Sequence, residues 1–156
     1  MDADHPGSVQ SFIEGILDAR GFGVLATHSG GQPHASLITI TPLLGLRHLV
    51  CATYRDSQKF GNLSSDSRVA VLIDGRGMDG PRRAESGVLT AQGRAGEISG
   101  AEQPIALDAL LRRHPDLEAF ARSDDCALVC VTVDTHQCVR AIDDVLWWPL
   151  GLPTGT

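Results

Sequence analysis

The sequence predicts a mainly β fold, a closed or nearly closed antiparallel barrel accompanied by a few helices. Short apolar runs recur along the chain, glycine- and proline-containing turns separate them, and only a few stretches show helical spacing. With 156 residues, of which 42% are apolar, the chain is long enough to bury a core as a single domain over residues 1–156. We expect the ordered core to cover about residues 8–148.

The first expected element is an amphipathic helix. Apolar residues recur there at helical spacing, at Val9, Phe12, Ile13, Ile16 and Leu17. Gly21 follows the last turn, where a left-handed residue often ends a helix. We expect this helix to pack on one face or end of the barrel.

Strand-like segments make up most of the remaining chain. They cover residues 23–27, 34–41, 47–52, 68–74, 87–98 and 127–133, with a further piece at 138–142. Pro42 is expected to end the second segment, and Gly93 to allow a bend or bulge in the fifth. A short helix is expected over 57–64, and residues 75–83, rich in breakers and charge, are expected to form an exposed loop.

Further helices are expected near residues 101–121. Ser99 and Glu102 have the spacing of a capping box, and the helix that follows is expected to end near residues 112–115. Leu117 and Phe120 suit a second short helix. The glycine- and proline-containing tail after Pro149 is expected to fray.

Composition excludes several classes of function. The formal net charge of −6 and the absence of a basic run argue against a nucleic-acid surface. No apolar stretch approaches the ~20 residues that a membrane-spanning helix needs. The acidic segment 1–5 lacks the apolar core of a signal peptide, so we expect a cytoplasmic protein.

The cysteines and histidines do not predict a metal site. None of the four cysteines, Cys51, Cys126, Cys130 and Cys138, forms a C-x-x-C pair, and none of the histidines has a spacing typical of metal ligands. Each cysteine lies in or beside an apolar strand-like run. We therefore expect buried, reduced thiols that pack as small hydrophobic groups.

The segment 53–63 is the strongest candidate for a binding site. It lies where a strand gives way to a short helix, and it combines Arg55, Ser57 and Lys59 with an amide, Asn62. Unsatisfied backbone N–H groups and a positive local dipole at such a helix start suit a phosphate. Lys59 would act as a point charge and Arg55 as a fork of donors. The alternative is a polar turn with solvated charges.

The segments around this loop, in their order, resemble the flavin-binding split-barrel family typified by pyridoxamine 5'-phosphate oxidase. The similar segments are 23–28, 33–40, 66–73 and 89–98, with Ser-x-Lys at 57–59 and Asn-Leu at 62–63. The resemblance implies a split β-barrel of six or more mostly antiparallel strands with Greek-key-like connections. It also implies a homodimer with two equivalent FMN sites at the interface, and an FMN-dependent oxidoreductase.

The resemblance also implies which residues would hold the cofactor. Ser57 and Lys59 match the phosphate-binding positions, Gln58 stands where the family usually has an arginine, and Arg55 is a candidate substitute for it. Main-chain groups of the second strand would bond the isoalloxazine ring. The remaining candidates are Ser36, Leu37, Ala52, Thr53, Tyr54, Asn62, Arg76 and Gln92.

Departures from the family pattern limit this expectation. The arginine-rich C-terminal segment of the true oxidase is absent, since Trp147-Trp148 is followed by proline, so we do not expect the chain to make pyridoxal phosphate. We expect the two tryptophans to cover an interface. No catalytic residue is assigned. The alternatives are an F420-dependent reductase of the same fold, and a flavin- or haem-binding protein that is not an enzyme, although no histidine follows His136.

Overall fold

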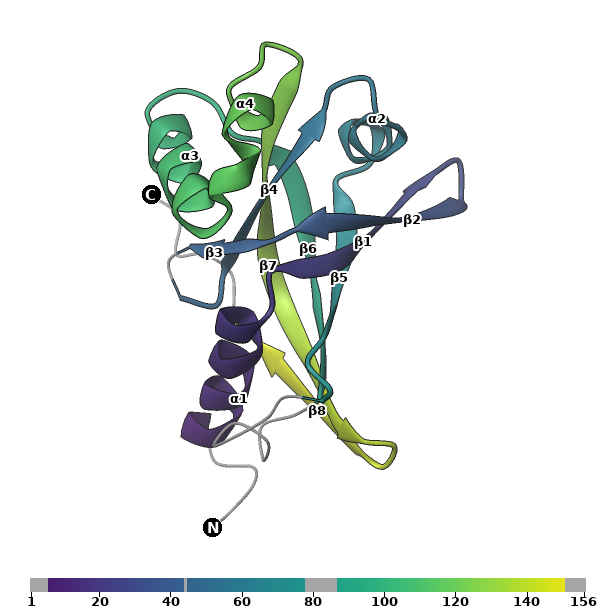
Figure 1. The fold of residues 1–156 in the computed structure, drawn as a ribbon. Helices are drawn as coiled ribbons and strands as arrows, with labels where there is room; N and C mark the ends of the chain where they lie inside the picture. Colours follow the sequence, from purple (N-terminus) through teal and green to yellow (C-terminus); the bar gives the residue numbers. More distant parts are fainter. Residues whose placement is uncertain (1–5, 44, 78–86, 151–156) are drawn as a thin grey trace.

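Eight antiparallel strands form one sheet that curls into a half-barrel (Figure 1). This computed structural model describes residues 6–43, 45–77 and 87–150. The strands are β1 (Phe22–Ser29), β2 (Gln32–Thr39), β3 (Thr41–Leu43), β4 (His48–Tyr54), β5 (Arg68–Asp74), β6 (Val88–Glu97), β7 (Cys126–Ala141) and β8 (Asp144–Pro149). Their order across the sheet is β2-β1-β5-β6-β7-β4-β3, and β8 pairs with β7. The predicted split-barrel class is confirmed.

The helices lie around this sheet. They are α1 (Pro6–Ala19), α2 (Gln58–Ser65), α3 (Glu102–Arg113) and α4 (Glu118–Ala121), with a 3-10 turn η2 (Pro115–Leu117) between the last two. In the described part of the chain, none of them is both long and apolar enough to cross a membrane. The positions of these helices confirm the three predicted helical regions. One detail differs, because Ser99 does not cap α3. The N-cap residue is Ala101, which makes no side-chain capping bond.

The second predicted strand is divided in two. β2 ends at Thr39, and Pro42, which we expected to end it, lies inside the short strand β3. The N–H group of Ile40 bonds the carbonyl of Gly21 in the same register as the β1–β2 ladder, and the chain then changes partner, so that β3 pairs with β4. Because β3 is the last strand in the sheet order, a proline without an N–H group is tolerated there.

The segments predicted at 127–133 and 138–142 form one strand, β7, of 16 residues. The register between β6 and β7 shifts between Gln92 and Gly93, so that Asp134 is the extra residue of a β-bulge. This confirms the bulge predicted at Gly93. The strand β8 was not predicted, and it forms a hairpin with the second half of β7.

The main core fills the inside of the half-barrel. Its strand residues alternate with outward-facing ones, and α1 adds Phe12, Ile13, Ile16 and Leu17, all almost fully buried. Full burial of each such side chain contributes roughly 1.5–3 kcal/mol. This confirms that α1 packs its apolar face on the barrel.

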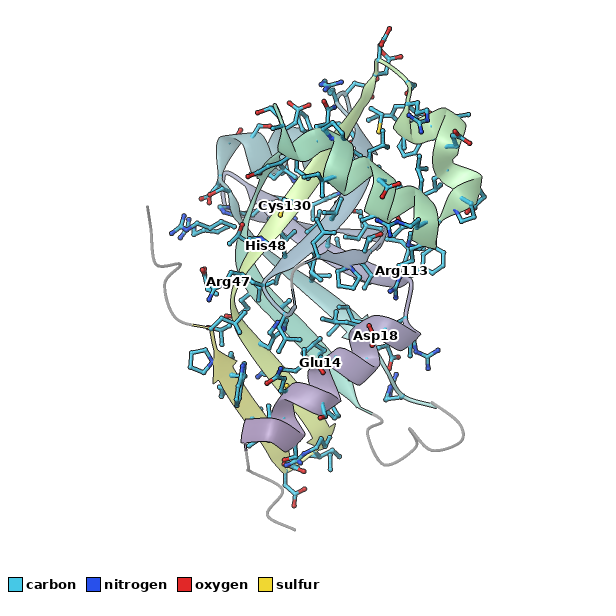
Figure 2. The ribbon with its side chains drawn as sticks, turned by 90° about the vertical axis from the view of Figure 1, so that its left-hand side faces the viewer. Glu14, Asp18, Arg47, His48, Arg113 and Cys130 are labelled. Atoms are coloured by element: carbon cyan, nitrogen blue, oxygen red, sulfur yellow. The ribbon has the colours of Figure 1, made fainter. Side chains whose placement is uncertain are left out.

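A second, smaller cluster lies on the other side of β4 and β7, beneath α3. It joins Val50 and Leu128 of the strands to Ala106 and Leu110 of the helix. Arg113, at the end of α3, donates to the carbonyls of Leu17 (2.6 Å) and Arg20 (2.7 Å), next to Asp18 at the end of α1 (Figure 2). It thereby satisfies carbonyl groups that the end of a helix leaves unpaired.

Candidate functional site

The start of α2 and the end of β4 bring two predicted hydroxyl groups together. Ser57 is the N-cap of α2, and its Oγ accepts a bond from the N–H group of Phe60. The same Oγ lies 2.9 Å from Thr53 Oγ1, and Thr53 is buried at the end of β4. The strand therefore fixes the position of the capping serine.

Lys59 stands in the first turn of α2 and is the only lysine of the sequence. It is half-buried, and it pairs with no carboxylate among the described residues. The N–H groups in the first turn of a helix lack intrahelical acceptors and carry a partial positive charge. The start of α2 therefore offers a cation, hydroxyls and amide donors to an anion.

The strand β2 lies near this opening and has a free edge. It pairs with β1 on one side, and it is the first strand in the sheet order, so the described strands leave its other edge unpaired. α2 contacts both β1 and β2. The main-chain donors and acceptors of this edge are thus available to a ligand.

Ser36 and Leu37 of β2 face opposite sides of the sheet. Ser36 is paired with the buried Leu25 and faces the barrel interior, where its Oγ is buried without a hydrogen-bond partner among the described residues. Leu37 faces outward and is 69% exposed. A buried hydroxyl without a partner points to a missing one, because such groups are usually bonded.

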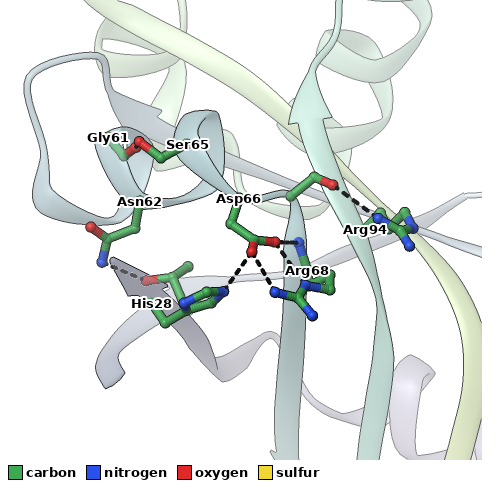
Figure 3. Close-up of polar contacts among 9 residues, drawn as sticks. His28, Gly61, Asn62, Ser65, Asp66, Arg68 and Arg94 are labelled. Atoms are coloured by element: carbon green, nitrogen blue, oxygen red, sulfur yellow. Dashed lines mark hydrogen bonds and ion pairs between the residues drawn. The ribbon is translucent and has the colours of Figure 1, made fainter. Parts of the chain in front are cut away.

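Asn62 has a structural role. Its side chain is buried, donates to Thr27 Oγ1 of β1 (3.1 Å) and accepts from Gln58 Nε2 (2.8 Å). Figure 3 shows the bond to β1. These contacts fix α2 on the sheet and engage both polar atoms of the amide. Gln58, at the position of the family's arginine, is engaged in the same contact.

Arg55 also has protein partners. Its Nη1 donates to the carbonyls of Asp124 (2.7 Å) and Cys126 (2.9 Å), and its Nη2 pairs with Glu97. The residue thereby ties the loop after β4 to the start of β7. Tyr54, next to it, is exposed on one side and packs its ring edge-on against Phe120, with ring centroids 4.7 Å apart.

Two predicted residues lie away from α2. Arg76 follows the far end of β5, where it pairs with Asp74 (2.9 Å) and its carbonyl accepts a bond from Arg20. This pairing is the main reason why the pKa of Asp74 falls to about 2. Gln92 lies on the outer face of β6. Of the other predicted residues at the end of β4, Ala52 packs against the cluster beneath α3, and Tyr54 packs against Phe120 of α4.

The thiols behave as buried apolar groups. Burial raises the pKa of Cys51 to about 12 and that of Cys138 to about 11. The pKa values of Cys126 and Cys130 are raised for the same reason. No cluster of three or more potential metal-binding side chains occurs within the described ranges.

A group of polar residues on the outer face of the sheet was not predicted from the sequence. His28 Nε2 and Arg68 Nη2 both contact Asp66 Oδ2, at 3.0 and 2.6 Å, and Arg94 lies on the next strand (Figure 3). The bidentate contact with Arg68 is the main reason why the pKa of Asp66 is far below its usual range. In the sequence, these residues alternate with apolar ones, which indicates that they face outward. Only the register of the strands shows that they lie close together.

Comparisons with known proteins agree with this fold. The family model for pyridoxamine 5'-phosphate oxidase matches residues 9–136. A search of curated proteins finds no match. Among solved structures, a haem-binding protein from Mycobacterium smegmatis is 22% identical with a TM-score of 0.79, and the match covers 91% of this chain and 58% of that protein. This chain therefore spans little more than half of that relative's length.

Two further structures cover more of the relative's length. General stress protein 26 from Bacillus anthracis strain Sterne is 19% identical with a TM-score of 0.70, and the match covers 91% of this chain and 98% of that one. An FAD-binding protein from Mesorhizobium loti is 19% identical with a TM-score of 0.62, covering 79% and 86%. These identities show a shared fold, and the family model covers most of the chain. The chain therefore belongs to the pyridoxamine 5'-phosphate oxidase family.

Proposed function

We propose that the protein is a homodimeric FMN-binding oxidoreductase. The observation that carries this proposal is the start of α2, where Lys59 stands without a carboxylate partner among the described residues, beside the bonded hydroxyls of Ser57 and Thr53. An anionic group such as the FMN phosphate would supply the missing charge. Lys59 and the first-turn amides would bond the phosphate oxygens.

The free edge of β2 supports a site for the isoalloxazine ring. Its main-chain groups near Ser36 and Leu37 can bond the polar edge of a planar ring, and the unpartnered Ser36 Oγ offers a further donor or acceptor. The residues present thus fit both ends of FMN. Arg55, Asn62, Arg76 and Gln92 are left out of this proposed set, because the first three have protein partners and Gln92 lies on the outer face.

When bound, the flavin would supply hydride or electron transfer at its ring. The contribution of this chain would be binding and orientation. Lys59 would neutralise the phosphate, and the backbone of β2 would fix the ring in the plane that these bonds define. No proton-transfer role is assigned to this chain.

The exposed face of β2, β1 and β5 supports a homodimer. Leu37, Val24 and Leu72 are direct neighbours across these strands, and Leu37 and Leu72 are 69% and 44% exposed. Phe22, two residues before Val24 on the same face, is 59% exposed. A contiguous apolar face of this kind marks an interface, here with a second copy of the chain.

A cytoplasmic location belongs to the same proposal. All four cysteines are free thiols, as expected in a reducing compartment.

The identity of the cofactor is tested by the visible spectrum of the purified protein and the mass of any compound that heat releases. We expect the two-band spectrum and the mass of FMN. A deazaflavin spectrum would identify the cofactor as F420, and a Soret band would identify it as haem. Haem is a specific alternative because the similar protein from M. smegmatis is a haem-binding protein. A colourless protein that binds none of the three would refute the proposal.

The phosphate assignment is tested by Lys59→Ala. Losing one charge-assisted contact should weaken FMN binding roughly 10- to 100-fold, measured by quenching of flavin fluorescence. Arg112→Ala, which removes an exposed cation on α3 that pairs with Asp108, is the matched control and should bind normally. Equal affinities of the two variants would contradict the assignment.

The single lysine permits a direct readout. Reductive methylation with 13C-formaldehyde labels only Lys59 and the N-terminus, so the lysine gives one resolved methyl signal. FMN should shift this signal, whereas riboflavin, which lacks the phosphate, should shift it far less.

The dimer face is tested by light scattering after size-exclusion chromatography. Leu72→Glu should convert the dimer to a monomer, because it places a charge within the apolar face. Ile105→Glu alters an exposed apolar residue on α3, 66% accessible, and should leave the dimer intact. A dimeric Leu72→Glu variant would place the interface elsewhere.

A further inference from the structure

A hollow of about 430 Å³ lies on the outer face of the sheet. Three neighbouring strands line it, each with consecutive residues: 26–28 of β1, 68–70 of β5 and 92–94 of β6. Its volume is in the range that small ligands occupy. The hollow does not include Ser57 or Lys59, so it is separate from the proposed phosphate site.

The strand register gives the hollow a flat floor. Ala26 of β1 is opposite Ala70 of β5, and Ala70 is opposite Gln92 of β6. Neighbours across antiparallel strands point to the same side of the sheet, and their Cβ atoms are ~5 Å apart. The two methyl groups therefore leave room for a planar ring, and the Gln92 amide lies at the edge of this floor.

The next outward row is cationic. Arg68 is opposite Arg94, and two residues beyond Ala26 on the same face of β1 is His28. Asp66 engages His28 and Arg68, as Figure 3 shows, and so holds both side chains in place. Arg94 has no carboxylate partner in the described part of the chain, and its only bond is a long one to Ser67 Oγ (3.5 Å).

The β-bulge adds a carboxylate to the border of the hollow that β7 forms, beside Gln92 and Gly93. Asp134, the extra residue of β7 at Gln92 and Gly93, lines the same hollow. Bulges occur often beside binding sites because they redirect a side chain. A carboxylate at this border would repel a second negative charge on a ligand, so the hollow suits a monoanion better than a dianion.

We propose that this hollow is a binding site for a small aromatic carboxylate. The ring lies on the methyl groups of Ala26 and Ala70, and the carboxylate accepts two parallel bonds from the guanidinium of Arg94. Arginine is suited to this geometry because its planar fork matches a carboxylate. The Gln92 amide donates to the same carboxylate from the adjacent position.

The proposal is tested by NMR with benzoate as the probe and the protein as it is purified. Benzoate should shift the amide signals of Ala26, Ala70 and Gly93 with a Kd of about 1 mM, and benzamide, which has the same shape without the charge, should not. Arg94→Gln should weaken benzoate binding about tenfold. Arg112→Gln, on α3, is the matched control and should change nothing.

A second variant tests the floor without touching the charge. Ala70→Leu fills the space above the floor from an outward-facing position, so it should abolish binding while the fold is retained. Four results would each overturn the proposal. Benzoate would change signals elsewhere in the spectrum, benzamide would bind equally well, phenyl phosphate would bind more tightly, or the Arg94→Gln variant would bind benzoate as well as the unchanged protein does. None of these results depends on the flavin, since Lys59→Ala should leave benzoate binding unchanged.

Discussion

Gly93 is the position at which adding one methyl group should do most harm. A Cβ atom there would lie 2.0 Å from the Thr132 carbonyl oxygen and 2.9 Å from Val133 Cα. Both are backbone atoms of β7, so neither can rotate away. The conformation of Gly93 is an ordinary one, and the obstacle is the close approach of the neighbouring strand at the bulge.

The cost of Gly93→Ala follows from this distance. To restore a separation of 3.0 Å, below which such contacts essentially do not occur, β6 and β7 must move apart by about 1 Å. That displacement breaks about two ladder hydrogen bonds and strains the packing, which together cost roughly 3–5 kcal/mol. The melting temperature should fall by roughly 10 °C for a chain of this size.

The assay is urea denaturation followed by circular dichroism at one protein concentration. Gly96→Ala is the control, because Gly96 lies on the same strand and a Cβ there meets no atom within 4 Å. It should change stability by less than about 1 kcal/mol, in the stabilising direction. If the two variants had the same midpoint, the close approach of β6 and β7 at the bulge would be refuted.

Three further predictions concern buried polar groups. Burial lowers the pKa of His136 below its ordinary value, so below about pH 6.5 the unfolded chain binds a proton that the folded protein does not. Stability should therefore fall as the pH falls from 6.5, and His136→Gln, which can still donate to the Leu46 carbonyl, should flatten this dependence in urea titrations. The raised pKa of Cys51 predicts that iodoacetamide leaves it unmodified in the native protein at pH 8, as peptide mass mapping would report. Asn62→Ala should cost about 1–3 kcal/mol in chemical denaturation, because Thr27 Oγ1 stays buried without its donor, and an unchanged midpoint would contradict the role given to this amide.

Local patterns of the sequence predicted most of the elements. The helical spacing of α1 and the apolar run of β5 are each visible within one short stretch of sequence, and both elements were predicted correctly. The boundary between β2 and β3 was not, because it marks a change of partner strand from β1 to β4, which no local pattern shows. β8 was missed although its valine and two tryptophans favour a strand, because the tryptophans were interpreted as cover for an interface at the end of the ordered region.

The candidate site shows the same limit. The resemblance identified Ser57 and Lys59 from their spacing, and the proximity of Ser57 to Thr53 follows from one short connection. The carbonyl partners of Arg55 lie about 70 residues away in the chain and cannot be predicted from its neighbours. Likewise, nothing in the sequence shows that His28, Arg68 and Arg94 share one face of the sheet.

The long strand β7 has a consequence for how the chain folds during synthesis. One edge of β7 pairs with β6, and the other pairs with β4 in its first half and β8 in its second. Because β7 is synthesised after β4 and β6, the edges with which these two strands pair with β7 stay unpaired until β7 is complete. The pairing of β4 with β7 joins residues more than 70 positions apart. Such non-local pairing slows folding. While the ribosome completes the chain, the apolar inner faces and free edges of β4 and β6 are therefore exposed, and surface of this kind favours aggregation.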